Sequence, residues 1–285
     1  MASTLAFMGD LVEARAHYNE ALALYRPAEH RRLMTRFGQD LRVTCLAFRS
    51  MDLWLLGYPE AALKDADCAL MEARQIEHAA TLMFTLNFPI LINTYCGNYD
   101  AANERLKELV VLAEEKGAPF RKAEGVLRRG YVLTLTGKAT KAVEMVTSGI
   151  DLWRSAGSTI FTPEHEFMLA IAHADSGQFD EAWRCIGEAM TAMQATKERW
   201  CEAEAHRVAG EIALQVAAAG RGESASVFRA FPDRCASTAG QVVGIARGHE
   251  PGAALELIRA NGKRHVTFSP PSTIGSPKVL TQATC

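Results

Sequence analysis

A glycine recurs at a fixed interval along the first two-thirds of the 285-residue sequence, and an alanine follows each copy at the same distance. Gly57, Gly97, Gly137 and Gly177 are spaced 40 residues apart, and Gly9 lies 48 residues before the first of them. The alanines, each five residues after its glycine, are Ala14, Ala62, Ala102, Ala142 and Ala182. A period of this length indicates an array of repeats that each contain more than one secondary-structure element.

Each repeat divides at its glycine into two segments with helical patterning. The apolar residues Leu106, Leu109, Val110 and Ala113, for example, are spaced as on one buried face of a helix. The predicted first helices are Val43–Leu56, Thr81–Tyr95, Lys122–Leu135 and Glu164–Ala174. The predicted second helices are Pro59–Arg74, Ala101–Glu115, Thr140–Arg154 and Glu181–Ala195.

The turn between the two helices follows from the residues around the glycine. Glycine is expected to end the first helix because it adopts the left-handed conformation at least cost. Asp100 and Asp180 are expected to accept hydrogen bonds from the first amides of the second helix. The small alanine side chain, one turn later, allows close approach of two helices. Hairpins of this kind cannot bury their apolar faces alone, so they are expected to stack into a solenoid.

Two turn strings, Gly97–Ala102 and Gly177–Ala182, resemble the turn and second-helix start of tetratricopeptide repeats. The 40-residue period resembles the longer repeats of the maltose-regulon activator class. The fold implied is all-α: a right-handed α-solenoid of about five tetratricopeptide-like helical hairpins, with an irregular C-terminal tail. We expect a repeat domain at residues 1–214 and the irregular tail at 215–285.

A narrower resemblance covers residues about 20 to 214. The strings Phe37 to Asp40, Trp54 to Pro59 and Glu198 to Trp200 resemble the C-terminal repeat regions of large bacterial signalling proteins. In those proteins a class III adenylate/guanylate cyclase or a DNA-binding domain precedes an AAA-like ATPase and then the repeats. The sequence has neither a P-loop nor the paired metal-binding aspartates of a cyclase, so these activities are not carried over.

Composition excludes several classes of function. The formal net charge is −2, which gives no broad positive field for nucleic acid. No apolar run of about 18 residues predicts a membrane span, and the start lacks the basic and apolar regions of a signal peptide. The seven scattered cysteines form no CxxC pair and are interpreted as reduced thiols. We therefore expect a cytoplasmic protein.

No group of residues predicts catalysis, a cofactor or a metal. His165, between Glu164 and Glu166, is interpreted as part of a solvated first helical turn rather than an acid–base pair. Glu202 and His206 have an i, i+4 spacing that could hold a metal, but a third ligand is lacking. The basic pairs Arg31-Arg32 and Arg128-Arg129 are interpreted as solvated faces or inter-repeat ion pairs; a third, Lys263-Arg264, falls in the tail.

The concave face of the solenoid is the best candidate for function, because the first helices of tetratricopeptide repeats line a groove that holds peptides. Counting back from each turn glycine gives the following predicted groove residues: Met51, Trp54, Phe84, Asn87, Leu91, Glu124, Leu127, Tyr131, Glu164, Phe167 and Ile171. The aromatic residues offer anchoring area and Asn87 could bond a peptide backbone. The alternative is that many of these residues form core.

Two functions follow. The first is a non-catalytic interaction module that binds a protein or peptide, or that self-associates through its groove or exposed ends. The second is a detached regulatory fragment of an ATPase-coupled cyclase or transcriptional regulator.

After Leu214 the repeat pattern stops. The residues from 215 on hold half of the ten prolines, and we interpret them as a repeat translated in a shifted reading frame. Permitted codons for residues 223–252, read from the second base, encode a helical hairpin with the alanine, aromatic and charge pattern of the repeats. On this hypothesis the chain is a fragment at both ends.

Overall fold

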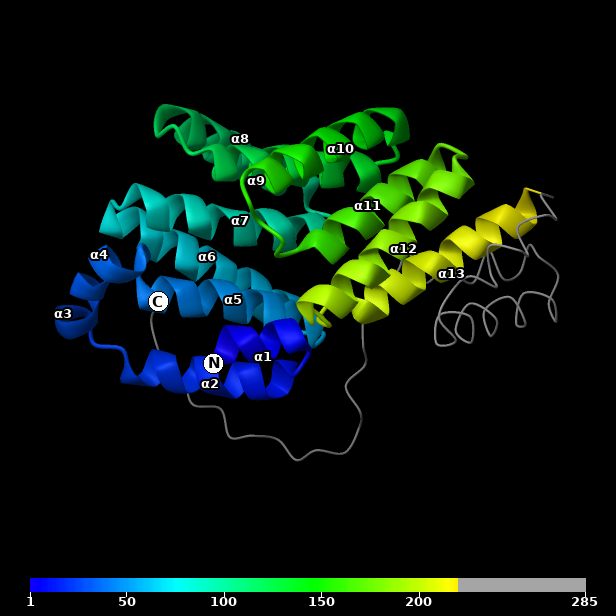
Figure 1. The fold of residues 1–285 in the computed structure, drawn as a ribbon. Coiled ribbons are helices and arrows are strands. Elements are labelled where there is room, and N and C mark those ends of the chain that lie inside the picture. Colours follow the sequence, from blue (N-terminus) through cyan, green and yellow to red (C-terminus); the bar gives the residue numbers. More distant parts are fainter. Residues whose placement is uncertain (220–285) are drawn as a thin grey trace.

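The computed structural model describes residues 1–219, and all the regular elements in that range are helices packed in sequence-adjacent pairs (Figure 1). The first helices of the five hairpins are α1 (Ala2–Met8), α5 (Leu41–Leu55), α7 (Ala79–Tyr95), α9 (Pro119–Leu135) and α11 (Thr162–Asp175). The second helices are α2 (Leu11–Leu24), α6 (Pro59–Ile76), α8 (Tyr99–Glu115), α10 (Ala139–Ser155) and α12 (Phe179–Thr196). A further helix, α13 (Glu202–Ala218), packs on the last hairpin. The predicted all-α solenoid of helical hairpins is confirmed.

The longer first interval is filled by three short helices. The segment between α2 and α5 contains α3 (Pro27–His30), the 3-10 helix η1 (Arg31–Leu33) and α4 (Met34–Phe37). Arg31 and Arg32 are exposed there, and the Arg32 Nε atom donates to the carbonyl of Glu29 at 3.1 Å. This pair is therefore a solvated surface, which is one of the two outcomes that the sequence allows.

The turns confirm the roles of the phased glycines and alanines. All five glycines have positive φ, from 72° at Gly137 to 93° at Gly9. The five phased alanines are completely buried, as expected for close helix contacts. The predicted aspartate caps are wrong: Asp100 and Asp180 lie inside the first turns of α8 and α12 and make no capping bond. At that position a carboxylate still interacts favourably with the positive helix end, through the dipole rather than through a hydrogen bond.

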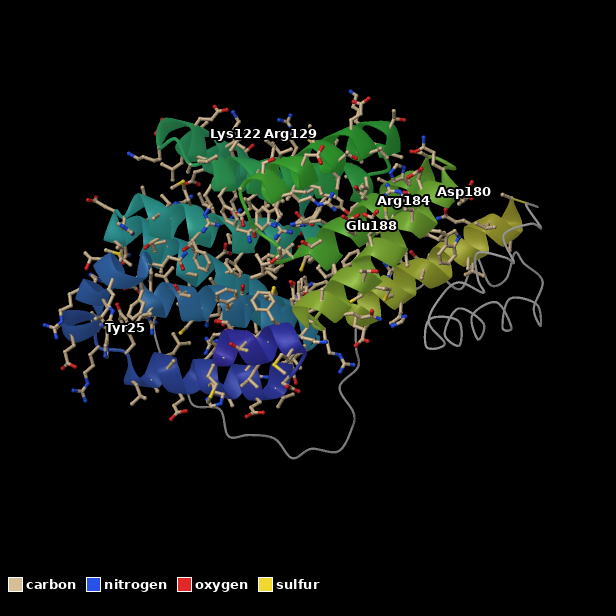
Figure 2. All side chains as sticks on the ribbon, viewed as in Figure 1. Tyr25, Lys122, Arg129, Asp180, Arg184 and Glu188 are labelled. Carbon is tan, nitrogen blue, oxygen red and sulfur yellow. The ribbon has the colours of Figure 1, made fainter. Side chains whose placement is uncertain are left out.

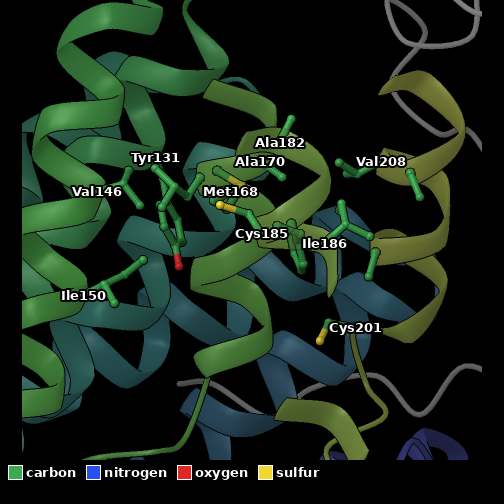
Figure 3. Close-up of a cluster of buried hydrophobic side chains, with 14 of the residues drawn as sticks. Tyr131, Val146, Ile150, Met168, Ala170, Ala182, Cys185, Ile186, Cys201 and Val208 are labelled. Atoms are coloured by element: carbon green, nitrogen blue, oxygen red, sulfur yellow. The ribbon is translucent and has the colours of Figure 1, made fainter. Parts of the chain in front are cut away.

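The core runs along the stack between the two layers of helices. Its largest cluster joins the later hairpins, and Figure 3 shows Tyr131 of α9, Val146 of α10, Met168 of α11 and Ile186 of α12 meeting in it, with Val208 of α13 at its edge. Smaller clusters fill the earlier hairpins. Each hairpin thus buries its apolar face against its neighbours, which is the reason the array stacks.

Four thiols, Cys45, Cys96, Cys185 and Cys201, are free, as expected.

The end of the described chain differs slightly from the expected boundary. Helix α13 continues four residues past Leu214, and the rest of the predicted tail, with Lys263-Arg264, lies outside the described residues. The division at residue 214 and the reading-frame hypothesis stay predictions. Within residues 1–219, no helix has the length and apolar character needed to cross a membrane.

Helices α9 and α10 approach most tightly at two glycines. A Cβ atom on Gly130 would lie 2.5 Å from a Val146 methyl carbon and 3.2 Å from the Val146 backbone nitrogen. On the other helix, a Cβ atom on Gly149 would lie 2.8 Å from the Leu127 side chain. The absent side chains therefore set the spacing between these two helices.

We predict that Gly130→Ala lowers the free energy of unfolding by about 1–3 kcal/mol, because overpacking outweighs the gain of up to about 1 kcal/mol in helix propensity. Gly187→Ala is the matched control, since a Cβ atom at this helical glycine of α12 meets nothing within 4 Å. It should stabilise the protein by up to about 1 kcal/mol. Urea unfolding followed by circular dichroism measures both changes. Equal effects of the two substitutions would contradict the close approach.

Candidate partner-binding face

The eleven predicted groove residues lie on α5, α7, α9 and α11, and we call the surface that these four helices turn toward the centre the inner face. Nine of the eleven are buried, and only Trp54 and Ile171 are partly exposed. The structure brings Met51, Leu91, Leu127, Tyr131 and Phe167 into one core cluster, against which Ile171 also packs. Phe84 belongs to a separate cluster near the first hairpin. The inner face is therefore filled in this structure, and partner binding there stays a prediction.

A buried ion pair lies at the middle of the inner face. The Nη1 atom of Arg128 lies 3.1 Å from a carboxylate oxygen of Glu164, and the two side chains are 3% and 0% exposed. The Nε atom of Arg128 donates to the side-chain oxygen of Asn87 at 2.7 Å, and the Tyr95 hydroxyl donates to the other oxygen of Glu164. Three hairpins thus meet through one guanidinium and one carboxylate.

Protonation within this group follows from burial. Burial first, and the neighbouring Glu164 carboxylate second, hold the pKa of Tyr95 well above its ordinary value, so its hydroxyl keeps the proton that it donates. Burial, with Arg128 nearby, holds the pKa of His165 well below its usual range, so its ring is neutral. The Nδ1 atom of His165 is hydrogen-bonded to the Tyr131 hydroxyl. Its Nε2 atom has no hydrogen-bond partner within residues 1–219. We call these six side chains the inner polar cluster: Asn87, Tyr95, Arg128, Tyr131, Glu164 and His165.

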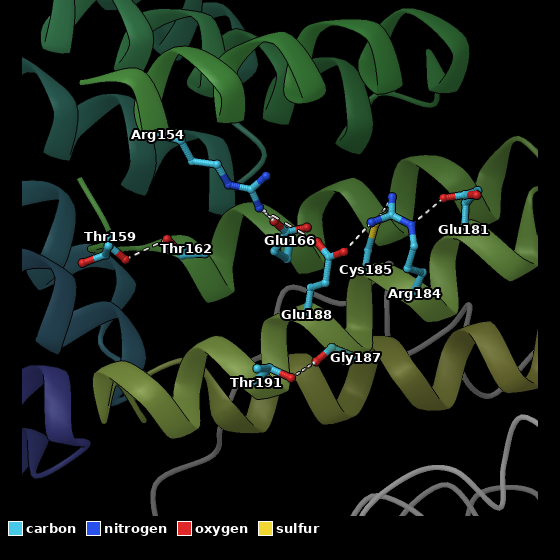
Figure 4. Close-up of polar contacts among 10 residues, drawn as sticks. All are labelled: Arg154, Thr159, Thr162, Glu166, Glu181, Arg184, Cys185, Gly187, Glu188 and Thr191. Atoms are coloured by element: carbon cyan, nitrogen blue, oxygen red, sulfur yellow. Dashed lines mark hydrogen bonds and ion pairs between the residues drawn. The ribbon is translucent and has the colours of Figure 1, made fainter. Parts of the chain in front are cut away.

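The start of α11 is buried, which corrects the expectation of a solvated first turn. Glu164, His165 and Glu166 are all at most 2% exposed. Glu166 accepts from Arg154 of α10 at 2.8 Å, and this contact continues to Glu188 of α12 (Figure 4). Burial, and then Glu188, raise the pKa of Glu166 to about 7. The expectation failed because the charged string at 164–166 is the part of α11 that enters the centre of the stack.

The two halves of the pair Arg128-Arg129 point in opposite directions. Arg128 forms the inter-repeat ion pair on the inner face, whereas Arg129 is exposed and lies on the outer side of α9 (Figure 2). Sequence reasoning proposed both outcomes for the pair and did not place Arg128 at the centre of the inner face. Glu202 pairs with Arg199 at 2.9 Å. Within residues 1–219 there is no group of three or more potential metal-ligating side chains.

Comparison with known proteins shows the fold. No protein-family model and no curated protein matches the chain. A solved structure of a Rap protein, complexed with competence and sporulation factor, matches with a TM-score of 0.58 at 18% identity. The match covers 85% of this chain and 62% of that one, so the chain spans less than two thirds of the Rap protein. The chain has a Rap-like helical-repeat fold. None of these comparisons supports the narrower resemblance to cyclase-linked or ATPase-linked proteins.

The first and last hairpins meet and close the inner face. The Phe7 carbonyl at the end of α1 accepts from the backbone amides of Arg199 at 2.7 Å and Trp200 at 3.3 Å. The Phe7 ring packs against Phe161 edge to face at 5.4 Å, and Phe161 packs against Trp200 at 5.7 Å. We call this contact the end closure; in Figure 1, α1 lies beside the turn from α12 to α13.

Glu198 holds the end closure in place from the inside. One of its carboxylate oxygens accepts from the Phe161 amide at 3.1 Å and from the Trp200 indole nitrogen at 3.3 Å. Phe161 has a left-handed backbone, with φ of 62°, and directly precedes α11. Phe161 therefore connects the end closure to α11, the helix that carries Glu164 and His165. Phe161 also contacts the inner polar cluster directly, because the Arg128 guanidinium lies over its ring at 5.9 Å.

We predict that Arg128→Met lowers the free energy of unfolding by roughly 3–5 kcal/mol, because the substitution leaves the Glu164 carboxylate buried without its counterion. Arg129→Met is the matched control, one residue away and exposed, and should change stability by no more than about 0.5 kcal/mol. Chemical unfolding at neutral pH measures both. Similar small effects at the two positions would show that Arg128 is solvated and that the inner face is open.

Proposed function

We propose that the chain is a non-catalytic protein-binding module that takes a peptide or a segment of a partner protein on its inner face when the end closure opens. The observation that carries the proposal is the inner polar cluster. A core that only holds helices together is usually at least as stable when a buried ion pair is replaced by apolar groups of similar shape. Retaining six polar side chains at the centre of the inner face is better explained by recognition.

The chemistry of the inner face suits an extended or helical peptide. Asn87 and Arg128 can bond backbone carbonyls or a carboxylate, and Glu164 can accept from backbone amides or a cation. Trp54 stacks on Tyr95 with ring centroids 4.7 Å apart, next to these polar groups. Stacked aromatic rings of this kind provide large contact area at low entropic cost. Polar groups beside such area are what peptide recognition by repeat proteins requires.

Opening at the end closure is the least costly way to expose this face. The closure consists of two hydrogen bonds to one carbonyl oxygen and the contacts of three rings, supported by two hydrogen bonds that Glu198 accepts. The neighbouring hairpins from α5 to α12, in contrast, bury apolar faces along helices of 14–18 residues. Local opening draws on the least stable contacts of a fold. The fold likeness to a Rap protein complexed with competence and sporulation factor agrees with a binding role.

Two further possibilities stay predictions. The resemblance of the Trp54–Pro59 string favours a regulatory segment of an ATPase-coupled cyclase or transcriptional regulator, and reading the coding DNA upstream tests this idea. Self-association through a solenoid end is favoured by Val12 and Leu24, which are exposed on α2 at the first hairpin. An analytical ultracentrifugation series in protein concentration tests it.

The main test locks the end closure with a disulfide. A Cβ atom on Gly9 would lie 3.5 Å from the Cβ atom of Arg199, within the range that a disulfide needs. Peptides are selected from a random displayed library on the reduced Gly9→Cys/Arg199→Cys protein, and their affinities are measured in the reduced and oxidised states. We expect binding to weaken at least about tenfold on oxidation, a loss of about 1.4 kcal/mol, and to return on reduction.

The controls separate locking from strain. The single variants Gly9→Cys and Arg199→Cys carry any strain at the left-handed Gly9 without forming the bridge, and oxidised wild type reports on the native thiols. Asn87→Ala should weaken the same peptides, because it removes an acceptor of the inner polar cluster. Equal affinities in the two redox states, or a selection that yields no lock-sensitive peptide, would overturn the proposal.

A further inference from the structure

A second surface, on the opposite side of the stack, forms a cleft over α9. Helices α8 and α10 both pack on α9 and flank it (Figure 1). Two adjoining hollows of about 890 and 650 Å³ lie along it, and they share Arg129, Leu133 and Lys138. We call their combined surface the outer cleft. It contains no residue of the inner polar cluster and does not depend on the end closure.

The outer cleft has an apolar floor and one half-exposed apolar wall. Val132 and Leu133 of α9 lie at its base, and Val110 and Val111 of α8 form a side, with Met145 of α10 opposite. Val111 is 53% exposed, among the most exposed large apolar side chains of the described chain. Apolar side chains arranged between helices in this way are typical of a groove that accepts another helix.

The charges of the hollow between α9 and α10 are mostly positive, whereas the hollow between α8 and α9 also has Asp100 and a Lys107–Glu104 ion pair in its lining. Within residues 1–219, Arg129, Lys138 and Lys141 form no ion pair, and the hollow that holds all three has Glu144 as its single acidic residue. This contrasts with the net charge of −2 of the whole chain. The cations also lie where they cost stability, because Lys138 and Lys141 are at the positive end of α10. The first turns of α6, α8 and α12 carry acidic residues instead.

We infer that the outer cleft binds an acidic amphipathic helix of a partner protein, with its apolar side chains on Leu133 and Val111 and its carboxylates facing Arg129, Lys138 and Lys141. Carboxylates would be favoured twice, by the three cations and by the α10 helix dipole. Nucleic acid fits less well, because three cations beside an apolar floor neutralise few phosphates. A partner on the inner face and a helix in the outer cleft can bind at the same time.

The test uses two synthetic helical peptides with the same leucine stripe. One carries glutamate and the other lysine at all remaining charged positions, and both have a neutral fluorophore for anisotropy. We expect the acidic peptide to bind at least about tenfold more tightly than the basic one and to weaken with added salt. Comparable binding of both peptides, or of neither, would overturn the inference.

Charge reversal then locates the site. Arg129→Glu should weaken the acidic peptide at least about tenfold. Lys122→Glu is the control: it reverses a charge on the exposed outer side of α9, two turns away and outside the cleft lining, and also removes the surface pair of Lys122 with Glu114 at 3.5 Å (Figure 2). An equal loss of affinity in both variants would mean that the acidic peptide is attracted only by general surface charge, and it would contradict binding in the outer cleft. The oxidised Gly9→Cys/Arg199→Cys protein should bind the acidic peptide unchanged, which distinguishes this cleft from the inner face.

Discussion

The two ends of this solenoid are joined by one backbone contact, from the Phe7 carbonyl to the amides of Arg199 and Trp200. Stacking of neighbouring hairpins places the inner polar cluster between α7, α9 and α11. The end closure adds a contact between the first hairpin and the last. The inner polar cluster is enclosed, so each of its charges needs a partner within the protein, because a buried unpaired charge lowers the stability of the fold.

The same arrangement separates two surfaces with different physical character. The inner face holds charges that are paired and dry, and access to it requires the ends to part. The outer cleft holds solvent-exposed charges, among which Arg129, Lys138 and Lys141 form no ion pair within residues 1–219, next to apolar side chains. A repeat array provides both because each of its helices presents one side to the centre and another outward. Arg128 and Arg129, adjacent on α9, show how one helix serves the two surfaces.

The repeats could be predicted from the sequence because the glycine phase is a local constraint. Every predicted helix is present, with boundaries shifted by a few residues, since helical patterning and a left-handed turn residue act within one hairpin. The end closure could not be predicted, because it joins Phe7 and Arg199 through backbone groups that leave no pattern. The predicted groove assumed that the inward sides of the first helices are open, whereas nine of its eleven residues are buried in core clusters or in the inner polar cluster. One signal was available: in the repeat position of Phe48, Phe88 and Met168, the fourth repeat has Arg128.

The measurement that tests the end closure most directly is hydrogen exchange at the Arg199 amide. Arg199 lies between α12 and α13, and its amide bonds to Phe7, whereas the amide of Lys197 bonds to Met193 at the end of its own helix. If the ends meet in solution, the Arg199 amide should exchange at least about a hundredfold more slowly than in an unstructured peptide. Exchange of Arg199 at the unstructured rate, while Lys197 stays protected, would show a folded but open solenoid and would contradict the enclosed inner face.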